Sequence, residues 1–183
     1  AAMGKIAATL DPSEDLFILF MTSHGSQDGT VAIMEKGRMQ GGLRPLQLRL
    51  ALQQAGIRNK VVIVSACFSG NFIPPFLNDP GATILTAAAA DKTSFGCEPS
   101  RDWTFFGDAL FNHAMRGGQG LNEAYRDALE LISTWEGDLH KQWEAMPAAQ
   151  KKNSPEPEPS NPQNNLGDNV IALVEKAEAY GIA

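Results

Sequence analysis

Residues 61–70 read VVIVSACFSG, an unbroken apolar run that ends in small and polar residues. Similar runs occupy 16–21 and 82–88, and none of the three alternates between apolar and polar side chains. Short continuous apolar runs are typical of strands buried on both faces of a sheet. Residues 43–55 are rich in Leu, Gln and Arg and are followed by Gly56, which predicts a helix of about three turns. A strand, a helix and a second strand form a parallel crossover unit, so the sequence predicts an α/β fold.

The rest of the chain adds helices and one polar, proline-rich stretch. Apolar residues recur every three or four positions from Leu121 to Met146, which predicts the longest helix. Residues 150–165 hold four of the eleven prolines, so we expect a mobile surface loop there. An apolar pattern resumes over 170–180 and predicts a short terminal element. The first ten residues resemble the tail of a helix, so we expect the opening strand of the sheet to lie upstream of Ala1.

Length and composition narrow the class of protein. A chain of 183 residues favours one domain over 1–183. The net charge of −6 and the scattered basic residues disfavour nucleic-acid binding. No apolar run approaches the ~18 residues of a membrane helix, and residues 1–5 do not resemble a signal segment, so we expect a soluble chain. Cys67 and Cys97 are too few for a disulfide framework and lack zinc-site spacing. Compartment and oligomeric state stay open.

Reactive side chains follow two of the predicted strands. Residues 22–26 read TSHGS after the first run, and Cys67 follows the second. The carboxyl ends of neighbouring parallel strands meet at one edge of a sheet, so we expect His24 and Cys67 to share a site. A thiol attacks as the thiolate, and an imidazole can take its proton and later protonate a leaving amine. The N–H groups of Gly25 and Cys67 can stabilise an oxyanion, typically by ~3 kcal/mol per donor.

Simpler interpretations exist for each of these residues taken singly. A lone cysteine at a strand end is usually a small buried side chain, and a histidine before glycine usually belongs to a turn. The joint placement of His24 and Cys67 after two strands favours catalysis. We expect His113 and His140, which lack such a context, to be structural or surface residues.

The pattern resembles the caspase-like clan of cysteine peptidases, which place His-Gly after one strand and Ala-Cys after the next. Within that clan, residues 86–97, TAAAADKTSFGC, followed by Phe106-Gly107-Asp108, are similar to the legumain family, also called C13 or asparaginyl endopeptidases. The resemblance covers roughly Leu16 to Met115. It implies a caspase-like three-layer α/β/α sandwich with a mostly parallel central sheet.

The resemblance also implies roles for individual residues. His24 is the base, Cys67 the nucleophile, and Gly25 and Cys67 supply the oxyanion donors. Ser94 and Asp108 line the pocket for the side chain before the cleaved bond, where a hydroxyl and a carboxylate can receive the NH₂ of asparagine. The implied activity is a cysteine endopeptidase that forms a thioester acyl-enzyme on peptide or protein substrates, with a preference for Asn. No metal or organic cofactor is required.

The chain departs from the family pattern at several positions, and two alternatives stay open. Ser65 and Ser23 stand where the family has acidic residues, and the family takes a pocket arginine and a His-orienting asparagine from the opening strand. The first alternative is a metacaspase- or caspase-like specificity for Arg/Lys or Asp, because Asp108 can equally hold a basic side chain. The second is a catalytically inactive caspase-like module that binds peptides or partners, for example through the proline-rich loop.

Overall fold

The computed structural model describes residues 2–98 and 101–180. A four-stranded sheet has the order β1 (Phe17–Thr22), β4 (Lys60–Ser65), β5 (Ala82–Thr86), β6 (Gln163–Asn165). Strands β1, β4 and β5 are parallel, and β6 runs antiparallel to β5. Thr22 pairs with Ser65, so β1 and β4 end at the same level. The three strands predicted from apolar runs and the mostly parallel sheet are confirmed.

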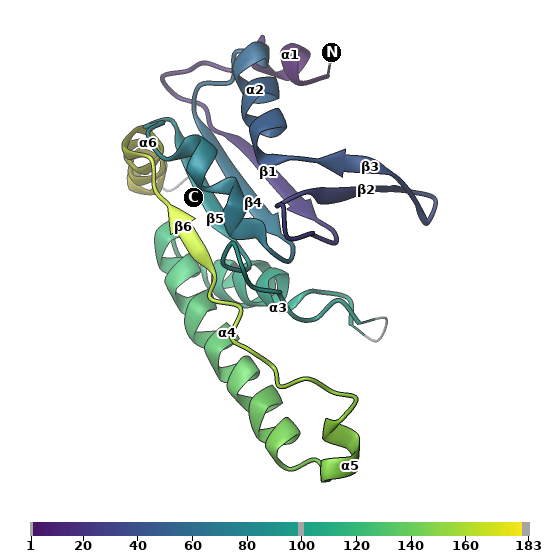
Figure 1. The fold of residues 1–183 in the computed structure, drawn as a ribbon. Coiled ribbons are helices and arrows are strands. Elements are labelled where there is room, and N and C mark those ends of the chain that lie inside the picture. The colour runs from purple at the N-terminus through teal and green to yellow at the C-terminus, as the bar shows by residue number, and fades with distance from the viewer. Residues whose placement is uncertain (1, 99–100, 181–183) are drawn as a thin grey trace.

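Helices cover both faces of this sheet (Figure 1). The α-helices are α1 (Ala2–Ala7), α2 (Pro45–Ala55), α3 (Phe105–Gly107), α4 (Leu121–Glu144), α5 (Ala148–Lys151) and α6 (Asp168–Ala179). A π-helical turn, η3 (Asp108–Ala114), continues α3, and 3₁₀ turns lie at η1 (Ser69–Phe72), η2 (Pro74–Phe76) and η4 (Met115–Gly117). The result is the three-layer α/β/α arrangement that the sequence predicts.

The core lies on both sides of β4 because successive side chains of a strand point to opposite faces. Val62 and Val64 belong to a cluster with Leu48 and Leu52 of α2. Val61 and Ile63 belong to a second cluster that includes the buried side chains of α3, η3 and α4. Full burial of one such side chain contributes about 1.5–3 kcal/mol, which explains why β4 is apolar at nearly every position.

Strand β1 corrects one expectation, because it is not buried on both faces. Phe17, Leu19 and Met21 pack against the α2 cluster, whereas Ile18 and Phe20 are 64% and 39% exposed. In the described part of the chain β1 is an edge strand, and the helical layer of α3, η3 and α4 packs mainly over β4 and β5. Phe20 contacts only the margin of that layer, at the ring of Phe111.

A hairpin that the sequence analysis did not predict separates β1 from α2. Its strands are β2 (Val31–Glu35) and β3 (Arg38–Leu43), and it projects from the main sheet in Figure 1. Lys36 and Gly37 at the tip both have positive φ, 49° and 74°, as the two central residues of a type I′ turn require. Helix α2 then starts at Pro45, where the missing N–H costs nothing, and ends before Gly56 in the left-handed region.

The C-terminal part contains more regular structure than the sequence suggested. Helix α4 agrees with the predicted longest helix, and the terminal element predicted over 170–180 is the helix α6, but 150–165 is not a plain surface loop. It begins in α5 and ends in β6, and Ser160 within it is 2% exposed. Polar side chains hold this stretch in place, which a hydrophobicity pattern cannot detect. An opening strand upstream of Ala1 and a single domain over 1–183 stay predictions. No helix in residues 2–98 and 101–180 is long and apolar enough to cross a membrane.

Candidate active site

The backbones of Gly25 and Cys67 meet at the carboxyl edge of β1 and β4, with His24 next to Gly25 in the chain. The pairing of these strands continues past their ends, since Ser23 N–H donates to the Ser65 carbonyl at 3.3 Å. A Cβ built on Gly25 would collide with the carbonyl oxygen of Cys67 and lie 2.9 Å from its carbonyl carbon. The backbones of Gly25 and Cys67 are therefore in direct contact, and only glycine permits this approach. Cys67 is half-buried and His24 is exposed.

The N–H of Gly25 takes no part in the hydrogen bonds that pair its segment with Val31. Gly25 forms an isolated bridge with Val31, and the two hydrogen bonds of that bridge run from Ala32 N–H to the His24 carbonyl and from Ser26 N–H to the Thr30 carbonyl. Both bonds flank Gly25, which places it at a non-hydrogen-bonded position of the pair. The hairpin thus fixes the backbone of His24 without using the Gly25 N–H.

The chain turns sharply after Cys67. Phe68 has φ +58°, a left-handed conformation that costs a non-glycine residue about 1–2 kcal/mol. Phe68 N–H donates to the Lys92 carbonyl at 2.7 Å, and Asn71 N–H donates to the Phe68 carbonyl at 3.2 Å. On the other side, Ser94 N–H donates to the Cys67 sulfur at 3.3 Å. A donor aimed at the sulfur stabilises negative charge there.

A cavity of about 390 Å³ opens beside this edge. Its lining comes from the end of β1 and from the segment before α3: Phe20, Thr22, Gly96, Cys97, Glu98, Arg101, Asp102, Trp103, Thr104 and Gly107. The hydroxyl groups of Ser65 and Thr104 lie 2.7 Å apart, which ties this wall to the end of β4, two residues before Cys67. His24, Cys67 and Ser94 do not line the cavity.

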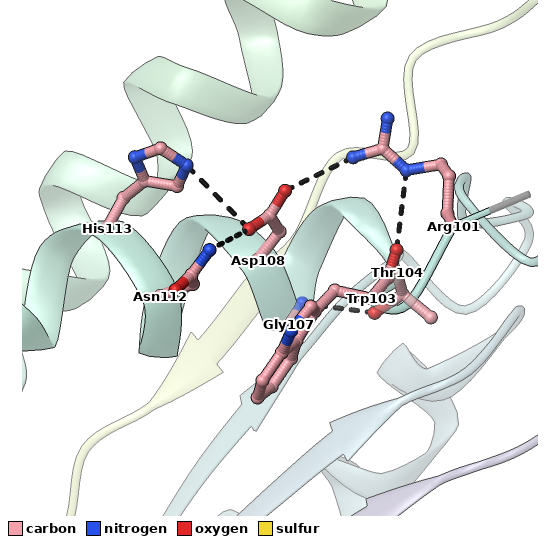
Figure 2. Close-up of polar contacts among 7 residues, drawn as sticks. All are labelled: Arg101, Trp103, Thr104, Gly107, Asp108, Asn112 and His113. Atoms are coloured by element: carbon pink, nitrogen blue, oxygen red, sulfur yellow. Dashed lines mark hydrogen bonds and ion pairs between the residues drawn. The ribbon is translucent and has the colours of Figure 1, made fainter.

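Figure 2 shows the polar contacts of the Asp108 carboxylate. It accepts hydrogen bonds from Arg101 Nη2 at 3.2 Å and Asn112 Nδ2 at 2.8 Å, and His113 Nε2 lies 3.7 Å away. The wide turn of a π-helix brings positions i+4 and i+5 close to position i, so both Asn112 and His113 reach Asp108. Asp108 is not among the described residues that line the cavity, but its partner Arg101 is.

Arg101 is held in one orientation by three contacts. Besides the bond to Asp108, its Nε donates to the Trp103 carbonyl at 3.4 Å, and its guanidinium carbon lies 4.7 Å from the centre of the Phe105 ring. The Arg101 side chain is 34% exposed and keeps donor groups free of these contacts. The arrangement presents a fixed cation at the wall of the cavity.

The model of the peptidase C13 family matches residues 2–150, which includes the whole edge that carries His24 and Cys67. The chain belongs to the peptidase C13 family. No curated protein matches it. C13 membership supports a cysteine peptidase of the legumain type, a hydrolase that acts on peptide or protein substrates, and it confirms the resemblance stated above.

The structure places each residue to which the sequence analysis of this C13 chain gave a role. The backbones of Gly25 and Cys67 meet, and His24 precedes Gly25 in the chain; the catalytic roles of all three stay predictions. Ser94 lies against the Cys67 sulfur, through its N–H and with its hydroxyl oxygen 3.7 Å from the sulfur. Asp108 does not line the cavity itself but accepts a hydrogen bond from Arg101, which does.

Cys97 and a second cavity have no assigned part in the predicted chemistry. Cys97 is exposed at the cavity, and partial burial of its sulfur, followed by the nearby Cys67, raises the pKa of its thiol. A larger cavity of about 630 Å³ lies at the opposite end of the strands, near the beginning of β4, far from the carboxyl edge. Its position excludes it as the place where Cys67 acts. Residues 2–98 and 101–180 contain no cluster of three or more metal-ligating side chains.

Sequence reasoning missed Arg101 and Thr104. Arg101 follows a stretch without periodicity, so nothing in the local pattern distinguished it from a solvated arginine. Thr104 did carry a signal, because its hydroxyl accepts from Gly107 N–H at 3.0 Å as a helix N-cap. That signal predicts a helix start but not the second contact, with Ser65.

Proposed function

We propose that this chain is a cysteine endopeptidase in which Cys67 is the nucleophile and His24 the general base. The observation that carries the proposal is the direct backbone contact between Gly25 and Cys67. It supports a shared site for the imidazole and the thiol at the ends of β1 and β4. Family membership supports the same reaction class.

In the proposed reaction, His24 takes the thiol proton and the Cys67 thiolate attacks the peptide carbonyl carbon. The negative charge that develops on the carbonyl oxygen is stabilised by the N–H groups of Gly25 and Cys67. Collapse breaks the C–N bond, and the imidazolium returns its proton to the leaving amine, which leaves a thioester on Cys67. Water, deprotonated by His24, then attacks the thioester and releases the carboxylic acid product and the thiol. An amine in place of water gives transpeptidation.

We assign the 390 Å³ cavity to the substrate side chain before the cleaved bond. Arg101 lines it and can donate hydrogen bonds, so the cavity suits a side-chain carbonyl oxygen, while the Thr104 hydroxyl can accept from an amide NH₂. Asparagine supplies both groups on a short side chain. Ser94 does not line this cavity, and its hydroxyl lies instead 3.7 Å from the Cys67 sulfur. Asp108 acts in this scheme by holding Arg101 rather than by touching the substrate.

One observation favours a second specificity, for a basic side chain before the cleaved bond. Glu98 and Asp102 also line the cavity, and a basic substrate side chain can pair with them. Both residues are exposed, and exposed ion pairs contribute only about 0–1 kcal/mol. The fixed guanidinium of Arg101 repels the same basic side chain. We therefore place Asn, and next Asp, ahead of Arg and Lys.

The reaction is tested by alkylation and the specificity by peptide cleavage. Iodoacetamide at neutral pH should label Cys67 faster than free glutathione, and His24→Ala should abolish that excess. A Cys67 that reacts no faster than glutathione, with no cleavage of any peptide, would establish the inactive binding module instead.

Fluorogenic peptides with Asn, Asp, Arg or Lys before the reporter bond decide the specificity. Arg101→Met should lower kcat/KM for the Asn peptide by about tenfold or more, the scale of a lost hydrogen bond to a charged group. Arg116→Met, which removes an exposed arginine outside the cavity, is the matched control. Fastest cleavage after Arg or Lys would reject the Asn assignment.

A further inference from the structure

A buried carboxylate on α4 has no part in the proposed chemistry. Glu136 is 8% exposed and, among the described residues, has no ion-pair partner. Its oxygens accept only from Ser160, whose N–H lies 3.2 Å from each oxygen and whose hydroxyl lies 2.5 Å from one of them. Burial of an ionised carboxylate is costly unless donors satisfy it, so the pair is a strong local constraint.

Ser160 anchors the proline-rich segment 155–162, which we call the strap. Its alternating prolines lack N–H donors, so the strap cannot join the sheet as a regular strand. Ser160 is 2% exposed, and its carbonyl accepts from Ala89 N–H at 2.8 Å. Lys92 Nζ lies 2.5 Å from Glu158. The strap is thus held between Glu136 on one side and residues 88–92 on the other.

Residues 88–92 in turn hold the loop that follows the nucleophile. Gly70 N–H donates to the Ala88 carbonyl at 2.9 Å, and Ala88 N–H donates to the Ser69 hydroxyl at 3.0 Å. The strained Phe68 is fixed by the Lys92 carbonyl, as described above. A Cβ built on Gly70 would lie 2.5 Å from Ala90 N and 2.9 Å from Gln163 Oε1, just beyond the strap. The nucleophile loop, residues 88–92 and the strap therefore pack in contiguous layers.

We propose that Glu136 is a positioning residue for Cys67, acting through Ser160 and residues 88–92. The left-handed backbone of Phe68 persists only where surrounding contacts hold it in place. Lys92 supplies such a contact through its carbonyl, and the strap in turn binds residues 88–92 through Ser160. This inference rests on the proposed function for its activity readout. The coupling of the strap to the nucleophile loop does not depend on it.

The test uses Glu136→Gln and Ser160→Ala, with Glu130→Gln as the control. Glutamine keeps the shape of Glu136 but can place its NH₂ against the Ser160 donors, and Ser160→Ala removes the hydroxyl bond alone. Glu130 is exposed on the same helix, so its change removes an equal charge without touching the strap. Each variant is measured for the Cys67 alkylation rate by site-resolved mass spectrometry, for kcat and KM, and for amide hydrogen exchange.

We expect Glu136→Gln to lower kcat and the Cys67 alkylation rate by about tenfold with KM little changed, and Ser160→Ala to lower both by a smaller factor. Exchange should rise in peptides that cover 67–71 and 86–94, and Glu130→Gln should match the wild type in every readout. The thermal midpoint of Glu136→Gln should change little, because removal of a buried charge offsets the weakened bonds to Ser160. That result separates positioning from loss of fold.

The proposal is overturned if exchange rises in the strap while 67–71 and the Cys67 reactivity stay at wild-type values. If Glu136→Gln does not fold, Ser160→Ala decides by the same criteria. Failure of the peptidase proposal is recognised separately, as a wild-type Cys67 whose alkylation does not depend on His24. The exchange experiment still reports on the strap in that case.

Discussion

Replacement of Gly25 by alanine should disable the site with only a moderate loss of stability. The added Cβ would collide with the Cys67 carbonyl oxygen and lie 2.9 Å and 3.3 Å from the Cys67 carbonyl carbon and nitrogen. These are backbone atoms, which cannot rotate away as a flexible side chain does. The end of β1 must therefore move relative to Cys67 by on the order of 1 Å, the scale of misplacement that costs about 10²-fold in rate.

The expected magnitudes follow from this displacement. Overpacking of this kind typically costs about 1–3 kcal/mol, which corresponds to a fall of about 2–12 °C in Tm for a chain of this size. The Gly25 N–H also leaves its place beside the reacting carbonyl, and loss of one oxyanion donor costs about 10²–10³ in kcat. We expect kcat to fall by at least ~10²-fold, far more than the stability loss explains.

The assay is cleavage of the Asn peptide together with thermal unfolding. Gly41→Ala is the control, because a Cβ at that position in β3 meets nothing within 4 Å. It should retain wild-type kcat and Tm. A Gly25→Ala enzyme with kcat within threefold of the wild type would refute the view that the Gly25–Cys67 contact builds the site.

Three further predictions concern pH, packing and thiol reactivity. Hydrogen bonds, of which the one from Ser26 has the largest effect and those from Thr30 the next, lower the pKa of Asp28 to about 2. The ionised Asp28 therefore stabilises the fold above the ordinary pKa of 3.8, and this stabilisation is lost as the pH falls towards 2. Between pH 3.8 and 2 the Tm of Asp28→Asn should fall less steeply with pH than that of the wild type, and an equal slope would contradict this. Phe72 is fully buried, so Phe72→Ala should lower the free energy of unfolding, measured in urea, by about 3–5 kcal/mol. A loss below about 1 kcal/mol would contradict tight packing around Phe72. Because burial raises the pKa of the Cys97 thiol, limiting iodoacetamide at pH 7 should label Cys67 first, and faster labelling of Cys97 by peptide mass spectrometry would count against an activated Cys67.

The parallel strands, and the meeting of the Gly25 and Cys67 backbones at their ends, were predictable from the sequence for one physical reason. Apolar runs reveal strands locally, and parallel pairing then brings their carboxyl ends to one edge without further information. The exposed face of β1 was predicted wrongly, because the reach of the helical layer over a sheet depends on how far α4 and η3 extend sideways. The β2–β3 hairpin was missed although Lys36-Gly37 carries a turn signal, since its strands are short and several of their apolar side chains, such as Ile33 and Met34, are exposed rather than packed in a core.

The order of residues along the chain was enough to predict the layered fold and the two strand ends after which His24 and Cys67 lie, because both follow from local hydrophobicity and from the rules of parallel connection. Folding alone decided which polar groups meet across long separations. Ser65 with Thr104 and Glu136 with Ser160 leave no periodic trace in the sequence, since each bond depends on where two distant segments pack. In the function that we propose, these two contacts support the wall of the substrate cavity and the loop after Cys67, so they influence what the predicted pair of side chains can act on.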